Sequence, residues 1–133
     1  MTTPEFFNSD HFAQLCGARV IEQRDGYARA EMPITDTIRN ASGWAQGGAV
    51  FALADIAFAA AAASHGQLTV TVNANIVFIK SAREGTLTAE AHELFDHKRI
   101  PFVEVRVTDD QGELIAHLTA TGYRKSSSAS SVQ

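Results

Sequence analysis

The stretch Gly47-Gly48-Ala49-Val50-Phe51-Ala52-Leu53-Ala54-Asp55-Ile56-Ala57-Phe58, which five alanines follow, decides the fold. Alanine is the strongest helix former, and neither proline nor another glycine interrupts the run before Ser64-His65-Gly66 ends it. The predicted helix is apolar on every face, which is typical of a helix that is buried all round. In a chain of 133 residues, the other segments must wrap around it.

The segments around this helix alternate apolar and polar residues, which is the pattern of half-buried strands. One such segment with a turn or bulge at Asp25-Gly26 precedes the helix, at residues 18–32. Four follow it, at residues 68–79, 86–95, 100–108 and 113–123. Short turns separate these four, so we expect an antiparallel meander. The sequence predicts an α+β fold in which an antiparallel sheet of five to six strands wraps around one long buried helix.

The length and the ends of the chain predict one domain with a loose tail. Residues 1–125 form the predicted domain. Its first 17 residues include a short helix over residues 5–15, which Gly17 ends. The Ser-rich residues 126–133 lack large apolar side chains other than Val132, and we expect them to be disordered.

The composition excludes several classes of protein. A net charge of -4 argues against nucleic acid as a partner, because phosphate binding needs clustered Lys and Arg. The longest apolar stretch, residues 49–63, is shorter than the roughly 20 residues that span a bilayer, so no membrane association is expected. Residues 1–10 lack the pattern of a signal peptide, and the single Cys16 forms no intrachain disulfide. We therefore expect a cytoplasmic protein.

The sequence predicts neither a metal nor a cofactor. None of the five histidines has metal-ligand spacing with Cys or carboxylates. No Gly-x-Ser-x-Gly, Gly-x-Gly-x-x-Gly or Walker motif is present, which argues against a serine hydrolase and a nucleotide site.

Asp55 is the residue that does not fit a buried apolar helix. An isolated buried carboxylate is costly, and it normally shifts its pKa. Asp55 lies eight residues after Gly47, about two turns into the helix, so it would look toward a pocket at the helix start and at a subunit edge. The alternative is a carboxylate that faces a polar patch or caps a neighbouring loop.

The Gly47-Gly48 pair is the second signal of a site. A helix N-terminus presents free N–H groups and a partial positive charge, and glycines there allow a substrate carbonyl to approach closely. This combination is a simple oxyanion hole for the negative charge that develops on a thioester oxygen. An ordinary Gly-rich helix start is the alternative.

Over roughly residues 18–124 the chain resembles the hot-dog acyl-CoA thioesterases of the phenylacetate-degradation type. That family reads Asn-x-x-Gly-x-x-His-Gly-Gly and then a helix with Leu-Ala/Val-Asp. The matching positions here are Asn40, Gly43, Gly47, Gly48 and Asp55. Gln46 replaces the usual His; it can donate a hydrogen bond but cannot titrate.

The resemblance implies a role for each matched residue. The Gly47 N–H would polarise the thioester carbonyl, and Asp55 of the other subunit would be the nucleophile or the general base. Asn40 would position the water or the thioester, and Thr71 would assist the water. The family usually joins two hot dogs into one continuous sheet with two shared sites, and pairs these homodimers into homotetramers.

The resemblance also suggests substrate contacts around the glycine pair, by Gln46, Gly48, Trp44, Lys80 and Arg83. Lys80 and Arg83 are either contacts of the CoA phosphates or ordinary exposed charges. Trp44 lines either the acyl pocket or a dimer contact. Phe51 and Phe58 are expected to shape the pocket.

The implied activity is hydrolysis of small or aromatic acyl-CoAs. Two other classes stay open. A non-catalytic acyl-CoA-binding hot dog would not need the acid at Asp55. An acyl thioester dehydratase or hydratase would need a His paired with an acid, and no His lies near the helix motif.

Overall fold

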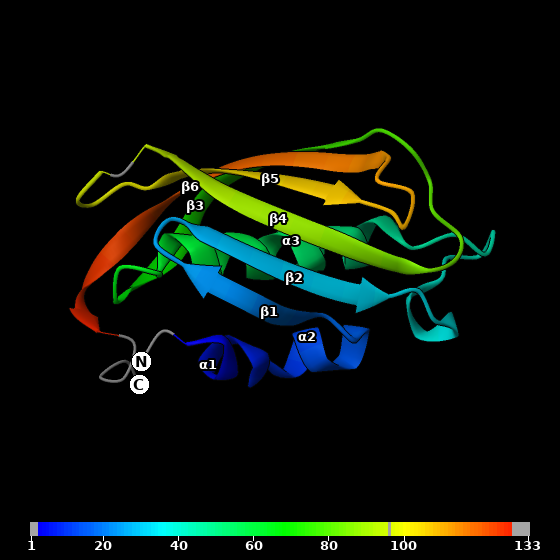
Figure 1. Ribbon diagram of the computed structural model, residues 1–133, viewed down its shortest axis with the longest axis horizontal. Helices are drawn as coiled ribbons and strands as arrows, with labels where there is room; N and C mark the ends of the chain where they lie inside the picture. The colour runs from blue at the N-terminus through cyan, green and yellow to red at the C-terminus, as the bar shows by residue number, and fades with distance from the viewer. Residues whose placement is uncertain (1–2, 96, 129–133) are drawn as a thin grey trace.

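The computed structural model describes residues 3–95 and 97–128, with side chains described as far as Lys125. Within these ranges, six strands form one curved antiparallel sheet around helix α3 (Gly47–Ala62) (Figure 1). The strands are β1 (Arg19–Arg24), β2 (Tyr27–Pro33), β3 (Gln67–Phe78), β4 (Thr86–Phe95), β5 (Phe102–Thr108) and β6 (Leu114–Ser128). The predicted α+β hot-dog architecture is confirmed.

The sheet has the order β1-β2-β4-β5-β6-β3, which corrects the predicted meander. Of the four strands that follow α3, only β4, β5 and β6 are neighbours in space as they are in sequence. The segment from Ile79 to Gly85 is not a hairpin turn, because it carries the chain from β3 at one edge to β4 beside β2. Period-2 patterns predict strands but not their neighbours, and a seven-residue connection suits either arrangement. As a result, β3 is an edge strand.

Helix α3 packs one side against the concave face of the sheet. Leu53, Ala54, Ala57 and Phe58 are fully buried there, against small and β-branched side chains of the strands. The opposite side carries Phe51, Ala52, Asp55 and Ala59, each of which is only partly buried. The uniformly apolar sequence predicted a helix that is buried all round. In one chain this is wrong, because one side of the helix is only partly buried.

The last turn of α3 is fixed by Arg124 of β6, which is buried beneath it. The Arg124 guanidinium donates to the carbonyl of Ala62 at 3.2 Å and pairs with Glu93 of β4 at 2.6 Å. A cation at the C-terminal end of a helix satisfies its free carbonyls and its partial negative charge. Arg124 therefore connects the helix to both halves of the sheet.

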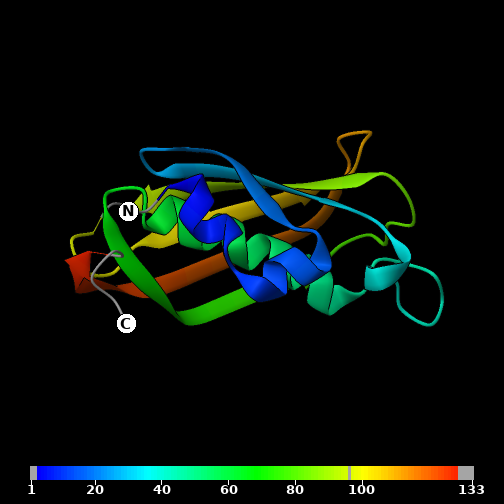
Figure 2. The same ribbon diagram turned by 90° about the horizontal axis from the view of Figure 1, so that it is seen from below.

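Two short helices replace the single N-terminal helix that the sequence predicted over residues 5–15. They are α1 (Pro4–Asn8) and α2 (His11–Cys16), and Gly17 ends α2 in a left-handed conformation, as expected. The break occurs at Ser9-Asp10 because the Asp10 side chain caps α2 by accepting from the Ala13 N–H. Both helices lie across the side of α3 that the sheet leaves open (Figure 2).

The C-terminal strand extends beyond the predicted domain limit. β6 continues to Ser128, which pairs with Gln67 of β3, so residues 126–128 are strand where a disordered tail was predicted. The backbone hydrogen bonds offered by a long edge strand stabilise a segment that has no apolar side chains of its own. The rest of the predicted tail, residues 129–133, lies outside the described residues. None of the helices in the described ranges is long and apolar enough to cross a membrane.

Candidate active site

A cavity of about 570 Å³ opens along the uncovered side of α3, between that helix, α2 and the end of β3. Its walls are mostly apolar, with two carboxylates and two glycines. The lining residues are Asp10, Phe12, Ala13, Gly47, Gly48, Phe51, Ala52, Asp55, Ile56 and Phe78. The cavity therefore brings together three residues that the sequence predicted for the site: Gly47, Gly48 and Asp55.

The start of α3 leaves backbone donors available at one end of this cavity. The side-chain oxygen of Gln46 caps the helix by accepting from the Ala49 N–H at 3.1 Å. In the described part of the chain, the N–H groups of Gly47 and Gly48 meet no acceptor. A Cβ at Gly47 would lie 3.4 Å from the Phe78 ring, so glycine keeps the approach open. Free N–H groups at a helix start are the kind of donor that can hold a developing oxyanion.

Gln46, at the position where the resembled family has His, has a structural role here. Its side-chain oxygen occupies the Ala49 N–H and leaves the donors of Gly47 and Gly48 exposed to the cavity. Gln46 is not itself among the cavity-lining residues. The structure therefore shows that Gln46 caps α3, and its predicted contact with the substrate stays a prediction.

Asp55 lies on the wall of the cavity, farther along α3. Burial raises the pKa of its carboxyl above the ordinary value of 3.8, since removal from water disfavours the charged form. A long contact of 3.5 Å, in which the Thr71 hydroxyl of β3 donates to Asp55 Oδ1, lowers the pKa and partly offsets that effect. The negative charge of Asp10 raises it further. The site thus holds a carboxylate that is a stronger base than an exposed one.

The Gly47 N–H and the Asp55 carboxylate of one chain lie too far apart to act on one bond. Eight residues of α-helix separate them, which corresponds to about 12 Å along the axis. Reacting groups need to be within about 3–3.5 Å of the atom they attack. A reaction that uses both groups therefore needs the Asp55 of a second copy to approach this Gly47.

Asn40 organises the loop that leads into α3. Its side-chain oxygen accepts from the N–H groups of Ser42, at 2.9 Å, and Trp44, at 3.1 Å. Asn40 and Gly47 line a second cavity of about 260 Å³, whose other wall includes Phe78 and Lys80. The loop thus places Asn40 and Gly47 on the wall of the same second cavity, at the start of α3.

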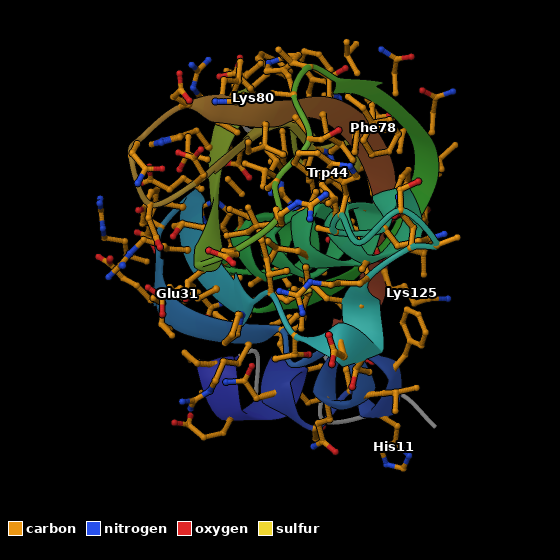
Figure 3. The ribbon with its side chains drawn as sticks, turned by 90° about the vertical axis from the view of Figure 1, so that its right-hand side faces the viewer. His11, Glu31, Trp44, Phe78, Lys80 and Lys125 are labelled. Atoms are coloured by element: carbon orange, nitrogen blue, oxygen red, sulfur yellow. The ribbon has the colours of Figure 1, made fainter. Side chains whose placement is uncertain are left out.

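Trp44, Lys80 and Arg83 lie outside the larger cavity. The Arg83 guanidinium stacks over the Trp44 ring at 4.4 Å from its centre, and Lys80 pairs with Glu113. In the end-on view of Figure 3, Trp44, Phe78 and Lys80 lie above α3, whereas His11 lies below it. Trp44, which was expected at either the acyl pocket or a dimer contact, does not line this cavity in one chain. Phe58, which was expected to shape the pocket, does not line it either, because it is fully buried on the sheet side of α3.

Six cavity residues were not predicted from the sequence: Asp10, Phe12, Ala13, Ala52, Ile56 and Phe78. Asp10 carries the signature of a helix cap, an acidic residue before an apolar run, but a cap says nothing about what else the side chain faces. Phe78 ends an alternating strand, and its place beside Gly47 depends on β3 lying at the sheet edge.

Comparison with known proteins identifies the family to which the chain belongs. The sequence pattern of the thioesterase superfamily matches residues 43–116, which include the start of α3, Asp55 and Thr71.

The chain is a member of the thioesterase superfamily.

One relative in the superfamily is a putative esterase of Archaeoglobus fulgidus, which is 36% identical over 119 residues, covering 89% of this chain and 77% of that protein. The acyl-coenzyme A thioesterase PaaI of Escherichia coli is 29% identical over 119 residues, with 89% and 85% of the two chains covered. The solved structure of the E. coli PaaI protein superposes with a TM-score of 0.88 at 26% identity, covering 93% of this chain and 91% of that one.

Another solved structure, a Streptococcus mutans protein bound to acetyl CoA, has a TM-score of 0.76 at 25% identity over 80% of this chain and 86% of that one. These comparisons support the hot-dog fold and a thioesterase of the PaaI-like type.

Two of the five histidines of this superfamily member pair with carboxylates. His65 contacts Glu93 at 3.0 Å, and His117 contacts Glu104 at 2.8 Å. In the described ranges, no group of three His, Cys, Asp or Glu side chains has the arrangement of a metal site.

Proposed function

We propose that this protein is an acyl-CoA thioesterase that hydrolyses small or aromatic acyl-CoAs with Asp55 as its catalytic carboxylate. One observation carries the proposal: the same apolar cavity is bordered by helix-start N–H groups that meet no acceptor among the described residues and by a carboxyl group whose pKa is raised by burial, so that two copies could bring the Gly47 of one to the Asp55 of the other. The N–H groups can stabilise a developing oxyanion, and the carboxylate can abstract a proton from water or attack the thioester carbon. The names of the E. coli relative and of the acetyl-CoA-bound structure support CoA thioesters as the substrate class.

In the general-base form of the reaction, the ionised Asp55 accepts a proton from water while the water oxygen bonds to the thioester carbon. The carbonyl oxygen gains negative charge and accepts a hydrogen bond from the Gly47 N–H. The C–S bond then breaks, and the CoA thiolate leaves and takes up a proton. Thr71, which contacts Asp55, would orient the water. Asn40 would position the water or the thioester at the helix start.

In the nucleophilic form, a carboxylate oxygen of Asp55 attacks the thioester carbon and expels the CoA thiolate. The product is a mixed anhydride, which water then hydrolyses to the acid and free Asp55. Both forms need the ionised carboxylate. Activity should therefore fall as the pH drops through the raised pKa of Asp55.

A second copy of the chain would complete each site. The β3 edge that borders the cavity exposes Val70, Val72, Val77 and Phe78, with Val72 70% exposed. A long apolar edge strand invites pairing with another chain. β3 of one protomer beside β3 of its partner would form a continuous sheet and bring the two α3 helices together. The proposed assembly is this homodimer, paired further into a homotetramer, as the resemblance implies.

The CoA part of the substrate would lie outside the acyl cavity, near Lys80 and Arg83. Both side chains lie on the segment that follows β3, and Lys80 lines the second cavity together with Asn40 and Gly47. Their present partners, Glu113 and the Trp44 ring, are exposed or partly exposed, so a phosphate group can compete for them. Acyl-CoA substrates and one unpaired cysteine fit a cytoplasmic enzyme.

The decisive experiment follows free thiol release from short-chain, long-chain and phenylacetyl CoA thioesters. Wild type and Asp55→Asn are compared with the matched control Asp25→Asn, which changes an exposed aspartate in the β1–β2 turn. We expect Asp55→Asn to lower kcat/KM by about 10²–10⁴-fold, the usual contribution of a positioned acid-base group. Asp25→Asn should match wild type.

Two results would contradict the proposal. Wild type that binds CoA thioesters without cleaving any of them would identify a binding module. Full activity in Asp55→Asn would move the chemistry to another residue. A hydratase or dehydratase would instead give a change in the acyl chain without thiol release; the described cavity wall contains no histidine to support that chemistry.

A further inference from the structure

The walls of the larger cavity carry negative charge without a compensating cation. Asp10 and Asp55 are its charged residues, and the other eight lining residues are apolar side chains or glycines. In the described part of the chain, no Lys, Arg or His lines this cavity. On this chain, a charged group that enters the cavity therefore meets side-chain charges of one sign.

Asp10 is held in place by the backbone of α2. Its Oδ1 accepts from the Ala13 N–H at 2.9 Å, which fixes the carboxylate at the rim of the cavity beside Phe12. Capping alone does not require a charge, because Asn and Ser cap helices about as well as Asp. A neutral cap would therefore serve α2 about as well, and the negative charge of Asp10 is not needed for the fold of this helix.

The field of Asp10 reaches into the cavity. The pKa of Asp55 is raised first by burial and then, in the same direction, by the negative charge of Asp10. Asp10 itself is exposed, so water and salt weaken its effect. The interaction is therefore modest and depends on ionic strength.

An acyl chain would meet this charge at a defined place. With the thioester oxygen at the Gly47 N–H, the chain can extend along α3 past Phe51, Ala52 and Ile56 toward the wall formed by α2. A neutral chain gains apolar contacts on the way. A chain that ends in a carboxylate approaches Asp10 and finds no cation.

We propose that Asp10 is a specificity-determining residue that makes this cavity reject acyl groups ending in a carboxylate. The inference rests on the proposed thioesterase function and adds to it the class of acyl group. The accepted acyl groups are uncharged, and dicarboxylic acyl-CoAs are discriminated against.

The test compares two thioesters that share a five-carbon acyl chain, pentanoyl-CoA and glutaryl-CoA. Only the second ends in a carboxylate. The readout is the ratio of kcat/KM for glutaryl-CoA to that for pentanoyl-CoA, measured at low salt for wild type, Asp10→Asn and Asp10→Ser. Both variants keep a helix cap and remove the charge. We expect each to raise the ratio about fivefold, which corresponds to a repulsion of ~1 kcal/mol between unit charges about 4 Å apart in water.

Glu5→Gln provides the matched control, since it removes one negative charge from the neighbouring helix α1 outside the cavity. Its ratio should equal that of wild type. Added salt should raise the wild-type ratio and change that of Asp10→Asn less. An unchanged ratio in both Asp10 variants, or an equal rise in Glu5→Gln, would overturn the role of Asp10.

The two proposals fail in distinguishable ways. Wild type that cleaves neither thioester would refute the thioesterase function. Wild type that cleaves pentanoyl-CoA, with a ratio that Asp10→Asn and Asp10→Ser leave unchanged, would refute only the specificity.

Discussion

The two sides of helix α3 have similar residues and different surroundings. On the sheet side, Leu53 and Phe58 are fully buried among strand residues. On the open side, Phe51 and Asp55 are partly buried and border a cavity. Alanines and large apolar residues occur on both. The difference teaches that an apolar helix surface shows where contact is made, whereas the surrounding elements decide whether that contact is with the core, a ligand or another chain.

The largest effect should come from truncating the packed side. Phe58→Ala removes a fully buried ring and leaves a cavity in the core, so we expect a loss of about 3–5 kcal/mol in the free energy of unfolding. Phe51→Ala, at the partly buried position on the same helix, should cost about 1 kcal/mol or less. Urea unfolding at one protein concentration measures both. Equal losses would mean that the open side is as tightly packed as the closed one.

A smaller effect, on activity, should show whether a second copy closes the open side. Gly47→Pro removes the N–H donor at the first helical position, where proline is tolerated, and should lower kcat/KM by about 10²–10³-fold. A heterodimer of Gly47→Pro with Asp55→Asn has one site with both groups intact, provided that each site takes its two groups from different chains. The isolated heterodimer, obtained by coexpression with two different tags, should then recover about half of the wild-type activity per dimer.

The control for this mixture is each variant mixed with itself, which should stay inactive. No recovery in a verified heterodimer would place Gly47 and Asp55 of each site in the same chain. That result would conflict with their separation along the helix.

The smallest effect should be a gain in stability from Asp55→Asn. The pKa of Asp55 is raised in the folded protein, so the stability contributed by its protonation is full below about pH 3.8 and is lost as the pH rises through the folded pKa. Above that pKa, wild type carries a partly buried charge that the variant lacks. We expect Asp55→Asn to be more stable by ~1 kcal/mol at pH 7, the lower end of the cost of burying a polar group whose lost hydration is incompletely replaced.

That gain should shrink to zero near pH 3.5, where both side chains are neutral. Thermal unfolding across this pH range measures the trend. A constant difference, or a less stable variant at pH 7, would show that the ionised Asp55 is well compensated in the fold.

The elements of the fold were predictable because each has a local sequence signal. The alanine-rich run defined α3, and the alternation of Val103, Val105 and Val107 defined β5; these three side chains are fully buried. The position of β3 was not predictable, because pairing with β6 instead of β4 depends on the whole sheet. The break between α1 and α2 depends on a single cap, Asp10, inside an otherwise helix-like stretch.

The candidate site was predictable where chemistry and helical spacing act together. Gly47 and Asp55 lie on one helix, so their common side followed from the sequence. The contact between Thr71 and Asp55 agrees with the place that the resemblance gave Thr71. Asp10 and Phe78 could not be found in this way, because tertiary structure brings them to the cavity from α2 and β3. Trp44, expected at either the acyl pocket or a dimer contact, does not line the cavity of a single chain, because proximity in sequence to the glycine pair does not fix the direction of a side chain.

The edge position of β3 also has a consequence for how the chain folds. The β4–β5 and β5–β6 pairs join neighbouring segments, whereas β3 must find β6 across the intervening strands, with Val70 opposite Tyr123 and Phe78 opposite Ala116. Closing a long loop costs entropy before its contacts form, so pairings distant in sequence tend to form late. β3 is therefore expected to dock after the three-stranded meander. The cavity wall formed by Phe78 and the contact of Thr71 with Asp55 would then be among the last parts of the protein to assemble.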